Sequence, residues 1–289
     1  MTERDRMIGE TPTTDVLAAF DADLPVVKGA TSWRGRWQRY LPAILAFIVV
    51  ILLWEGLTRL LRVETFVLPK PSEVMTSFFG TASVIWGAGY RTLIEALGGF
   101  VIGVTLAVAT SLAAARWVGF RAGILPLAIA ANATPIVALA PIFNNWFSIT
   151  SPISKMGVVA VVVYFPVMIN TTRGLLEIDP AEIELMRSIA ATPTEVTRRI
   201  RIPNALPYFF SALKVASALS LIAAIVAEYF GGPQDVLGQY IINRANLFQF
   251  PDAWAAILVA SILGVVFYLL ILVAERLLMP WHVSFRSTE

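Results

Sequence analysis

Six runs of apolar residues, each about long enough to cross a lipid bilayer, restrict the fold of this sequence more than any other feature. They lie at 42–61, 92–114, 122–147, 153–173, 207–230 and 253–278. A bilayer core about 30 Å thick requires roughly 20 apolar residues in an α-helix, because each residue advances the helix by only about 1.5 Å. The runs therefore predict an all-α membrane protein with about six transmembrane helices.

The third run differs from the others because polar residues and prolines interrupt it. Its interruptions are Asn132, Pro135, Pro141, Asn144 and Asn145. Breaks of this kind survive in a membrane only where protein or a cavity covers the freed backbone groups. We therefore expect this segment to face the interior of the helix bundle.

Composition agrees with a membrane location and argues against catalysis. Charged residues make up 15% of the chain, whereas soluble domains carry roughly 25%. The chain has no cysteine and a single histidine, His282, which excludes disulfides and cysteine nucleophiles and argues against a histidine-based metal or acid–base site. We expect no catalytic residues, no metal and no cofactor in this chain.

Lysine and arginine residues beside the runs predict the orientation in the membrane, because cytoplasmic loops carry an excess of both. One side collects Lys28, Arg34, Arg36, Arg39, Arg116, Arg121, Arg173, Arg187, Arg198, Arg199, Arg201, Arg276 and Arg286. The other side holds Arg59, Arg62, Lys70, Arg91, Lys155 and Arg244. The asymmetry places both termini in the cytosol and makes 174–206 the longest inner loop.

The two ends of the chain lie outside the apolar runs. Residues 1–40 mix acidic, Thr, Pro and Arg residues without an apolar run, so they are not a secretory signal peptide and predict a cytosolic, partly disordered tail. Residues 284–289 form a short C-terminal tail that we also expect in the cytosol. The segment between them, 41–283, is the predicted six-span domain.

The inner loop 174–206 contains two helix-start signals in succession. These are "DPAE" at 179–182 and "TPTE" at 192–195, in which a cap residue precedes Pro and a Glu three residues later can bond back to the cap. They predict short helices over 176–191 and 193–202, with a bend at 190–192 and an end at Pro203. Because a handful of polar residues would suffice to connect two spans, the loop is predicted to dock a partner.

This loop resembles the "EAA" cytoplasmic loop of bacterial ABC importer permeases, written E-A-A, three residues, G, nine residues, I-x-L-P. Glu184 stands at the E, Ala190 at the G, and Pro203 at the P, with the spacing kept. The two Ala positions are Leu185 and Met186, and Ile200 and Ile202 stand at I and L. The predicted ATPase-coupling residues are Glu184, Ala190, Ala191, Thr192, Ile200, Ile202 and Pro203.

Further segments resemble the nitrate, sulfonate, taurine and bicarbonate group of these permeases, so that the resemblance covers roughly 64–283. They are "FVLPKPSEV" at 66–74, "TPIVALAPIFNNWFSI" at 134–149, "IVAEYFGG" and "VLGQYI" around Glu228 and Gly238, and "ERLLMPW" at 275–281. The resemblance implies the type I ABC importer permease fold in a bacterial inner membrane. Its expected solute is nitrate, a sulfonate such as taurine, bicarbonate or a pyrimidine-like heterocycle.

The same resemblance implies the partners. Two permeases, either two copies of this chain or this chain and a near copy, would bind two cytosolic ABC ATPases and receive solute from an extracytoplasmic binding protein. ATP and Mg²⁺ would bind to the ATPases, since this chain has no G-x-x-x-x-G-K-[ST] phosphate loop. Membrane lipid is an expected partner and nucleic acid is not, because spans of lipid length flank the arginines that might suggest a DNA-binding motif.

Polar residues within the runs are candidates for the lining of a solute pathway. They are Asn132, Asn144, Asn145, Tyr164 and Glu228. Hydrogen bonding between helices explains asparagines equally well. Glu228 could gate the outer mouth, pair with Arg244 or cap the Gly231–Gly232 turn. We expect Lys214 to reach the headgroups and Glu95 to lie near the outer interface without a special role.

Two rival classes remain at this point. A secondary carrier driven by an ion gradient would need ionisable groups near the middle of the membrane, and the runs contain few. A membrane enzyme would need a nucleophile, a base or metal ligands within the spans, and the runs show no such group.

Overall fold

The computed structural model describes residues 33–133 and 135–280. His282 and the C-terminal tail at 284–289 lie outside the described residues, as does most of the N-terminal tail. The chain divides into two compact units, Met1–Phe47 with Arg286–Glu289 and Ile48–Phe285. In the first unit, the described residues form only the start of helix α2, and all of the sites below belong to the second unit.

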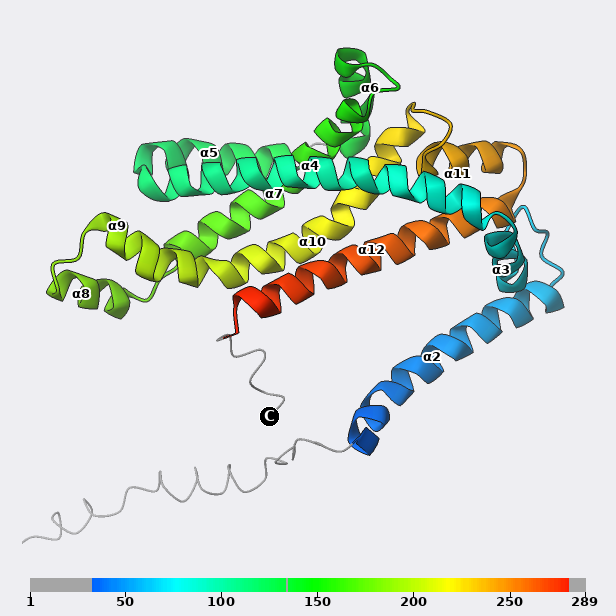
Figure 1. The fold of residues 1–289 in the computed structure, drawn as a ribbon, viewed down its shortest axis with the longest axis horizontal. Helices are drawn as coiled ribbons and strands as arrows, with labels where there is room; N and C mark the ends of the chain where they lie inside the picture. Colours follow the sequence, from blue (N-terminus) through cyan, green and yellow to red (C-terminus); the bar gives the residue numbers. More distant parts are fainter. Residues whose placement is uncertain (1–32, 134, 281–289) are drawn as a thin grey trace, which may run out of the picture. The chain divides into compact units, whose positions relative to one another are not determined.

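The described elements are helices (Figure 1). They are α2 (Trp33–Leu60), α3 (Pro71–Gly80), α4 (Ala82–Arg116), α5 (Val118–Asn132), α6 (Ile136–Phe147), α7 (Pro152–Leu176), α8 (Pro180–Ser188), α9 (Pro193–Val196), the π-helical segment η2 (Thr197–Arg201), α10 (Ile202–Tyr229), α11 (Leu237–Asn246) and α12 (Phe250–Leu278). Five helical stretches are long and apolar enough to cross a membrane: Leu41–Leu60, Ala82–Arg116, Pro152–Leu176, Pro193–Tyr229 and Phe250–Leu278. They confirm five of the six predicted spans.

The third predicted span, 122–147, is wrong as a single helix. It is divided between α5 and α6, and α5 is an apolar helix of only 15 residues. Pro135 is the N-cap of α6 and has an extended backbone (φ −63°, ψ 118°), and proline has no N–H with which to continue the hydrogen bonds of a preceding helix. The interruption that the sequence suggested therefore breaks the helix instead of merely bending it.

Small residues bring α4 and α7 into close contact. Gly99, Gly103, Ala107 and Ser111 recur every four residues and are buried, so they form one stripe along α4. A Cβ atom on Gly99 would lie 2.4 Å from the Val159 Cβ, and one on Gly103 would lie 2.6 Å from a backbone oxygen of α7. Helix pairs in membranes commonly pack through such stripes, because small residues let the backbones approach.

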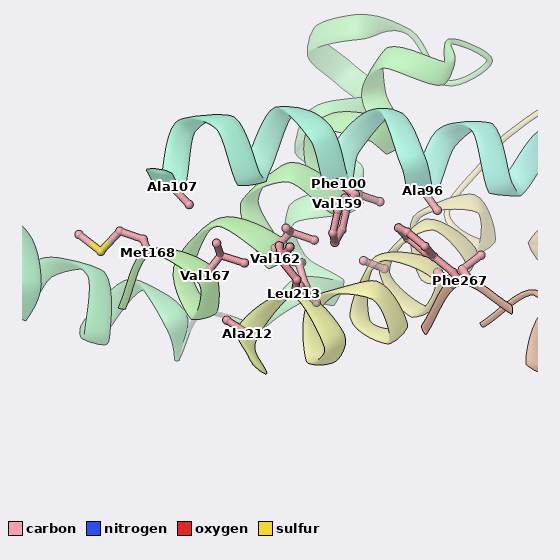
Figure 2. Packing of buried hydrophobic residues seen from close by; sticks show 14 of the residues in the cluster. Ala96, Phe100, Ala107, Val159, Val162, Val167, Met168, Ala212, Leu213 and Phe267 are labelled. Atoms are coloured by element: carbon pink, nitrogen blue, oxygen red, sulfur yellow. The ribbon is translucent and has the colours of Figure 1, made fainter. Parts of the chain in front are cut away.

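The main hydrophobic core joins α4, α7, α10 and α12. Figure 2 shows Phe100 of α4, Val159 and Val162 of α7 and Leu213 of α10 directed toward one another. Phe267 of α12 completes this core with an edge-on contact to Phe100, at 4.9 Å between ring centroids. Aromatic pairs prefer this geometry because the positive ring edge meets the negative ring face.

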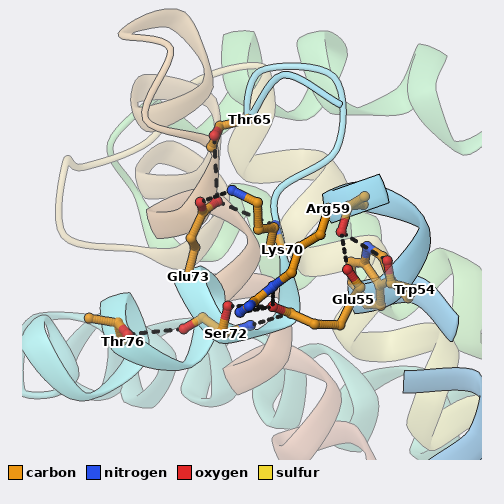
Figure 3. Close-up of polar contacts among 9 residues, drawn as sticks. Trp54, Glu55, Arg59, Thr65, Lys70, Ser72, Glu73 and Thr76 are labelled. Atoms are coloured by element: carbon orange, nitrogen blue, oxygen red, sulfur yellow. Dashed lines mark hydrogen bonds and ion pairs between the residues drawn. The ribbon is translucent and has the colours of Figure 1, made fainter. Parts of the chain in front are cut away.

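A polar network connects the end of α2 to the start of α3 (Figure 3). The Glu55 carboxylate accepts hydrogen bonds from the Ser72 backbone N–H (3.1 Å) and hydroxyl (2.9 Å), and it pairs with Arg59. Lys70 donates to Glu73 at 2.7 Å, which lowers the pKa of Glu73. The segment "LPKP" therefore serves to start α3 with a proline in its first turn and an acidic residue beside its amino end.

Candidate functional site

The predicted bend in the inner loop is present and has a defined backbone geometry. Asp179 caps α8 by accepting from the Ala181 N–H at 2.9 Å. The helix ends at Ser188, and Ala190, just beyond its C-cap, has a φ of +52°. The Ala190 N–H donates to the Arg187 carbonyl (2.9 Å) and the Ala191 N–H to the Met186 carbonyl (3.0 Å). This pair of bonds is the Schellman motif, which usually places glycine where Ala190 stands.

The second helix start is also confirmed. Thr192 accepts from the Glu195 N–H (3.3 Å), and the Glu195 carboxylate accepts from the Thr192 N–H (2.8 Å). This reciprocal pair is the predicted capping box. At the first start, the hydrogen bonds described for the segment include the Asp179 cap but no return bond from Glu182.

The predicted end of the second helix at Pro203 is wrong. The helix runs without interruption from Pro193 to Tyr229. Within η2 the turns widen, and the Ile202 N–H donates to the Thr197 carbonyl five residues back. In a regular α-helix the ring of Pro203 would crowd the carbonyl of Arg199, whereas the wider π turn accommodates a residue that has no N–H.

We call the segment from α8 through η2 the elbow. Among the predicted coupling residues, Glu184, Ala190, Thr192 and Ile202 are exposed, and Ala191, Ile200 and Pro203 are half-buried. At one end of the elbow, Leu185 and Ile189 expose 64% and 61% of their surface.

Ile189 escaped the sequence analysis, although an apolar pair four residues apart among charged neighbours indicates one helix face. Glu184, Leu185, Ile189 and Ala190 together form the elbow tip. Exposed apolar side chains bordered by charges are typical of a protein interface.

Among the predicted pathway residues, the structure brings only Asn144 and Glu228 into one polar group, which also contains Lys155. The Asn144 side chain donates to the Phe230 carbonyl (3.3 Å) and accepts from Lys155 Nζ (3.2 Å). Asn132 and Asn145 are exposed and make no side-chain hydrogen bond among the residues described. Tyr164 packs against the main hydrophobic core and contacts Phe165. The hydrogen bonds of the described residues therefore do not connect Asn132, Asn145 or Tyr164 to this polar group.

A buried charged cluster lies where α4, α7, α10 and α11 meet. Glu95 of α4 is 3% exposed, and Lys155 of α7 and Glu228 of α10 are fully buried. The Lys155 side chain lies near both carboxyl groups. Glu228 accepts from the Gly238 N–H at 2.6 Å, and Lys155 also donates to the Ile149 carbonyl. Burial of such charges is costly unless hydrogen bonds compensate. Among the described residues, Asn144 and the Ile149 carbonyl accept from Lys155, and the Gly238 N–H donates to Glu228, so these bonds tie the helices together at the cluster.

This cluster corrects several predictions. Glu228 does not pair with Arg244, which instead contacts Asp252 (3.6 Å) and lies over the Tyr240 ring. The Glu228 carboxylate accepts a hydrogen bond from the first turn of α11 and not from the glycine turn that follows α10. Glu95 belongs to the cluster, whereas the sequence analysis expected no special role for it.

The sequence analysis also missed the partners of two lysines. Lys214 pairs with both carboxylate oxygens of Glu275, at 3.0 and 2.9 Å, a partner that the sequence analysis did not predict. Lys155 was counted only as a basic residue of the outer side. Its position just inside an apolar run was the signal that it needs a buried partner.

The fold and the elbow define a membrane protein of several spans that presents a structured surface for docking at one end. The family model described as "Binding-protein-dependent transport system inner membrane component" matches residues 99–281, and the chain belongs to this family. It is therefore the membrane-spanning permease component of an ABC transport system.

Curated relatives and a solved structure agree with this family. The chain is 29% identical over 248 residues to the formylaminopyrimidine transport permease protein ThiX of Halalkalibacterium halodurans, which covers 86% of this chain and 98% of the relative. It is 29% identical over 266 residues to the riboflavin transport system permease protein RibX of Chloroflexus aurantiacus, covering 90% and 98%. The structure titled "Crystal structure of an amino acid ABC transporter with histidines" has a TM-score of 0.56 at 17% identity and covers 70% of this chain and 97% of that chain, which shows a shared fold.

Proposed function

We propose that this chain is one of two permease subunits in an ATP-driven importer. Two cytosolic ATPases bind ATP and Mg²⁺ and dock at the elbows, and an extracytoplasmic binding protein delivers a small polar solute. The permease itself carries out no chemistry. The names of the two relatives described above refer to nitrogen heterocycles, which favours a heterocycle over nitrate, sulfonates or bicarbonate.

The observation that carries this proposal is the exposed elbow tip at the start of a continuous helix. Leu185 and Ile189 provide apolar surface for an ATPase, and Glu184 lies beside them. The helix that follows spans 37 residues, or about 55 Å at 1.5 Å per residue. Its last turn carries Glu228 into the buried charged cluster, so a movement imposed on the elbow reaches the far end of this helix.

Substitution of the elbow tip tests the docking of the ATPase. In Glu184→Lys and in Leu185→Ser/Ile189→Ser we expect the permease to stay in the membrane while the ATPase no longer co-purifies with it or hydrolyses ATP without uptake. Glu182→Lys changes the same charge two residues away, on another face of α8, and is the matched control. Normal assembly and uptake in both tip variants would overturn the docking proposal.

The energy source separates an importer from a secondary carrier. In proteoliposomes that contain the permease, its ATPase and its binding protein, uptake should require ATP, and an imposed proton or sodium gradient should not replace it. Accumulation of solute by the permease alone under such a gradient would establish the carrier instead. Glu95, Lys155 and Glu228 would then be the first ion-coupling residues to test.

A further inference from the structure

A groove with a volume of about 760 Å³ separates the end of α4 from the elbow. Arg116 of α4, Arg187 of α8 and Arg201 of η2 line this groove, and none of the described residues that line it is acidic. Three arginines from three different elements thus face one space. Trp117 directly follows Arg116 in the chain and is exposed, and tryptophan is concentrated at the boundary between membrane and water.

The arginines of the groove have few partners within the chain. Arg201 donates to the Ala115 carbonyl at 3.4 Å. Within 33–133 and 135–280, none of the three takes part in a salt bridge. A guanidinium group carries several N–H donors arranged for oxygen anions such as phosphate. The groove therefore suits an anion with several acceptor oxygens.

A second, apolar groove of about 180 Å³ adjoins the first. The two grooves share Leu112, and the second continues one turn along α4 to Val108 and reaches Leu206 and Phe209 of α10. All of its lining residues are apolar except Thr171. An acidic side chain or a free phosphate would occupy the arginine groove and leave this apolar groove empty, whereas a phospholipid has a part for each.

We propose that the two grooves form a binding site for one anionic phospholipid. Its phosphate lies among Arg116, Arg187 and Arg201, and an acyl chain follows Leu112 into the apolar groove. Basic pockets between membrane helices bind anionic headgroups in this manner. The bound lipid holds the elbow against the end of α4, while the elbow tip, formed by other residues, stays free for the ATPase.

Lipid binding by the purified full-length permease in detergent tests this proposal. Dioleoyl phosphatidylglycerol should bind more tightly than dioleoyl phosphatidylcholine, measured as lipid retained by mass spectrometry and as a rise in the thermal unfolding midpoint. In Arg116→Gln/Arg187→Gln the affinity for phosphatidylglycerol should fall about fivefold per arginine, from roughly 1 kcal/mol for each. Arg198→Gln/Arg199→Gln removes the same charge from exposed residues beside the groove and should leave the affinity unchanged.

Two further arms identify the ligand. Leu112→Trp fills the apolar groove and should also weaken phosphatidylglycerol binding, and inorganic phosphate should not reproduce the thermal shift. Full stabilisation by phosphate, or normal binding in Leu112→Trp, would overturn the lipid and indicate an anion site alone. Equal binding of the two lipids, or equal loss in the control variant, would contradict the site itself. If Arg116→Gln/Arg187→Gln released the ATPase and kept normal lipid binding, the groove would belong to the ATPase.

Discussion

Ala190 occupies a backbone conformation that favours glycine. Its φ of +52° closes α8, and an L-residue with a Cβ atom pays roughly 1–2 kcal/mol there. The family motif has glycine at this position, and the sequence keeps the spacing without the residue. The geometry of the elbow is thus retained despite a less suitable side chain.

Replacement of Ala190 by glycine should stabilise the elbow. Relief of the left-handed strain exceeds the greater freedom of glycine in the unfolded chain, which costs about 0.4–1 kcal/mol, so a gain of up to about 1 kcal/mol is expected. Ala181→Gly, in the helical first turn of α8, should instead destabilise by up to about 1 kcal/mol. Thermal unfolding in detergent measures both, and shifts of the same sign would contradict this account.

Gly238 is a residue at which the absence of a side chain matters. A Cβ atom there would lie 2.6 Å from the Glu228 Cβ and 2.6 Å from the Ile225 carbonyl oxygen. Gly238→Ala should therefore push α11 from α10 and destabilise the fold by about 1–3 kcal/mol. Gly119→Ala is the control, because its added Cβ would meet no atom within 4 Å apart from its chain neighbours and the backbone of its own helix. An unchanged unfolding temperature in Gly238→Ala would show that α11 can shift freely.

At the scale of elements, the sequence predicts helix starts better than helix ends. Asp179 and Thr192 cap their helices as expected because capping depends on a few neighbouring residues. Pro203 did not end its helix, because η2 changes the hydrogen-bond spacing around it, and no local pattern predicts a π turn. Glu95 and Lys155 were misjudged for another reason: their partners lie on helices far away in the sequence.

The buried charged cluster should hold α4, α7 and α10 together. Lys155→Met removes the cation beside Glu95 and Glu228 together with its hydrogen bonds to Asn144 and to the Ile149 carbonyl, and should destabilise by about 1–3 kcal/mol. In Lys155→Met/Glu228→Gln, part of that loss should be recovered, since one unpaired charge is removed with it. Lys70→Met breaks the partly exposed pair with Glu73 and should cost about 1 kcal/mol or less. If the loss in the double variant equalled the sum of the losses in Lys155→Met and in Glu228→Gln, the two charges would not interact.

At the scale of the whole molecule, the distribution of basic residues predicts the topology, which the fold does not itself determine. The sequence places both termini in the cytosol and Phe66–Gly89 on the opposite side. A cysteine introduced at Thr81 should react with an impermeant reagent in intact cells, and one at Thr194 should react only after permeabilisation. Because the chain has no native cysteine, each introduced cysteine is the only one that can be labelled. The reverse labelling pattern would contradict the predicted topology.

The stripe of small residues on α4 limits how this permease can move. Gly99 and Gly103 let α4 and α7 interlock so closely that neither can slide past the other without a collision of backbones. Ser111 adds a hydrogen bond across the same contact, to the Met168 carbonyl at 3.0 Å. We therefore expect the two helices to move as one rigid unit, so that a passage for solute opens by tilting of this pair rather than by sliding of a single helix.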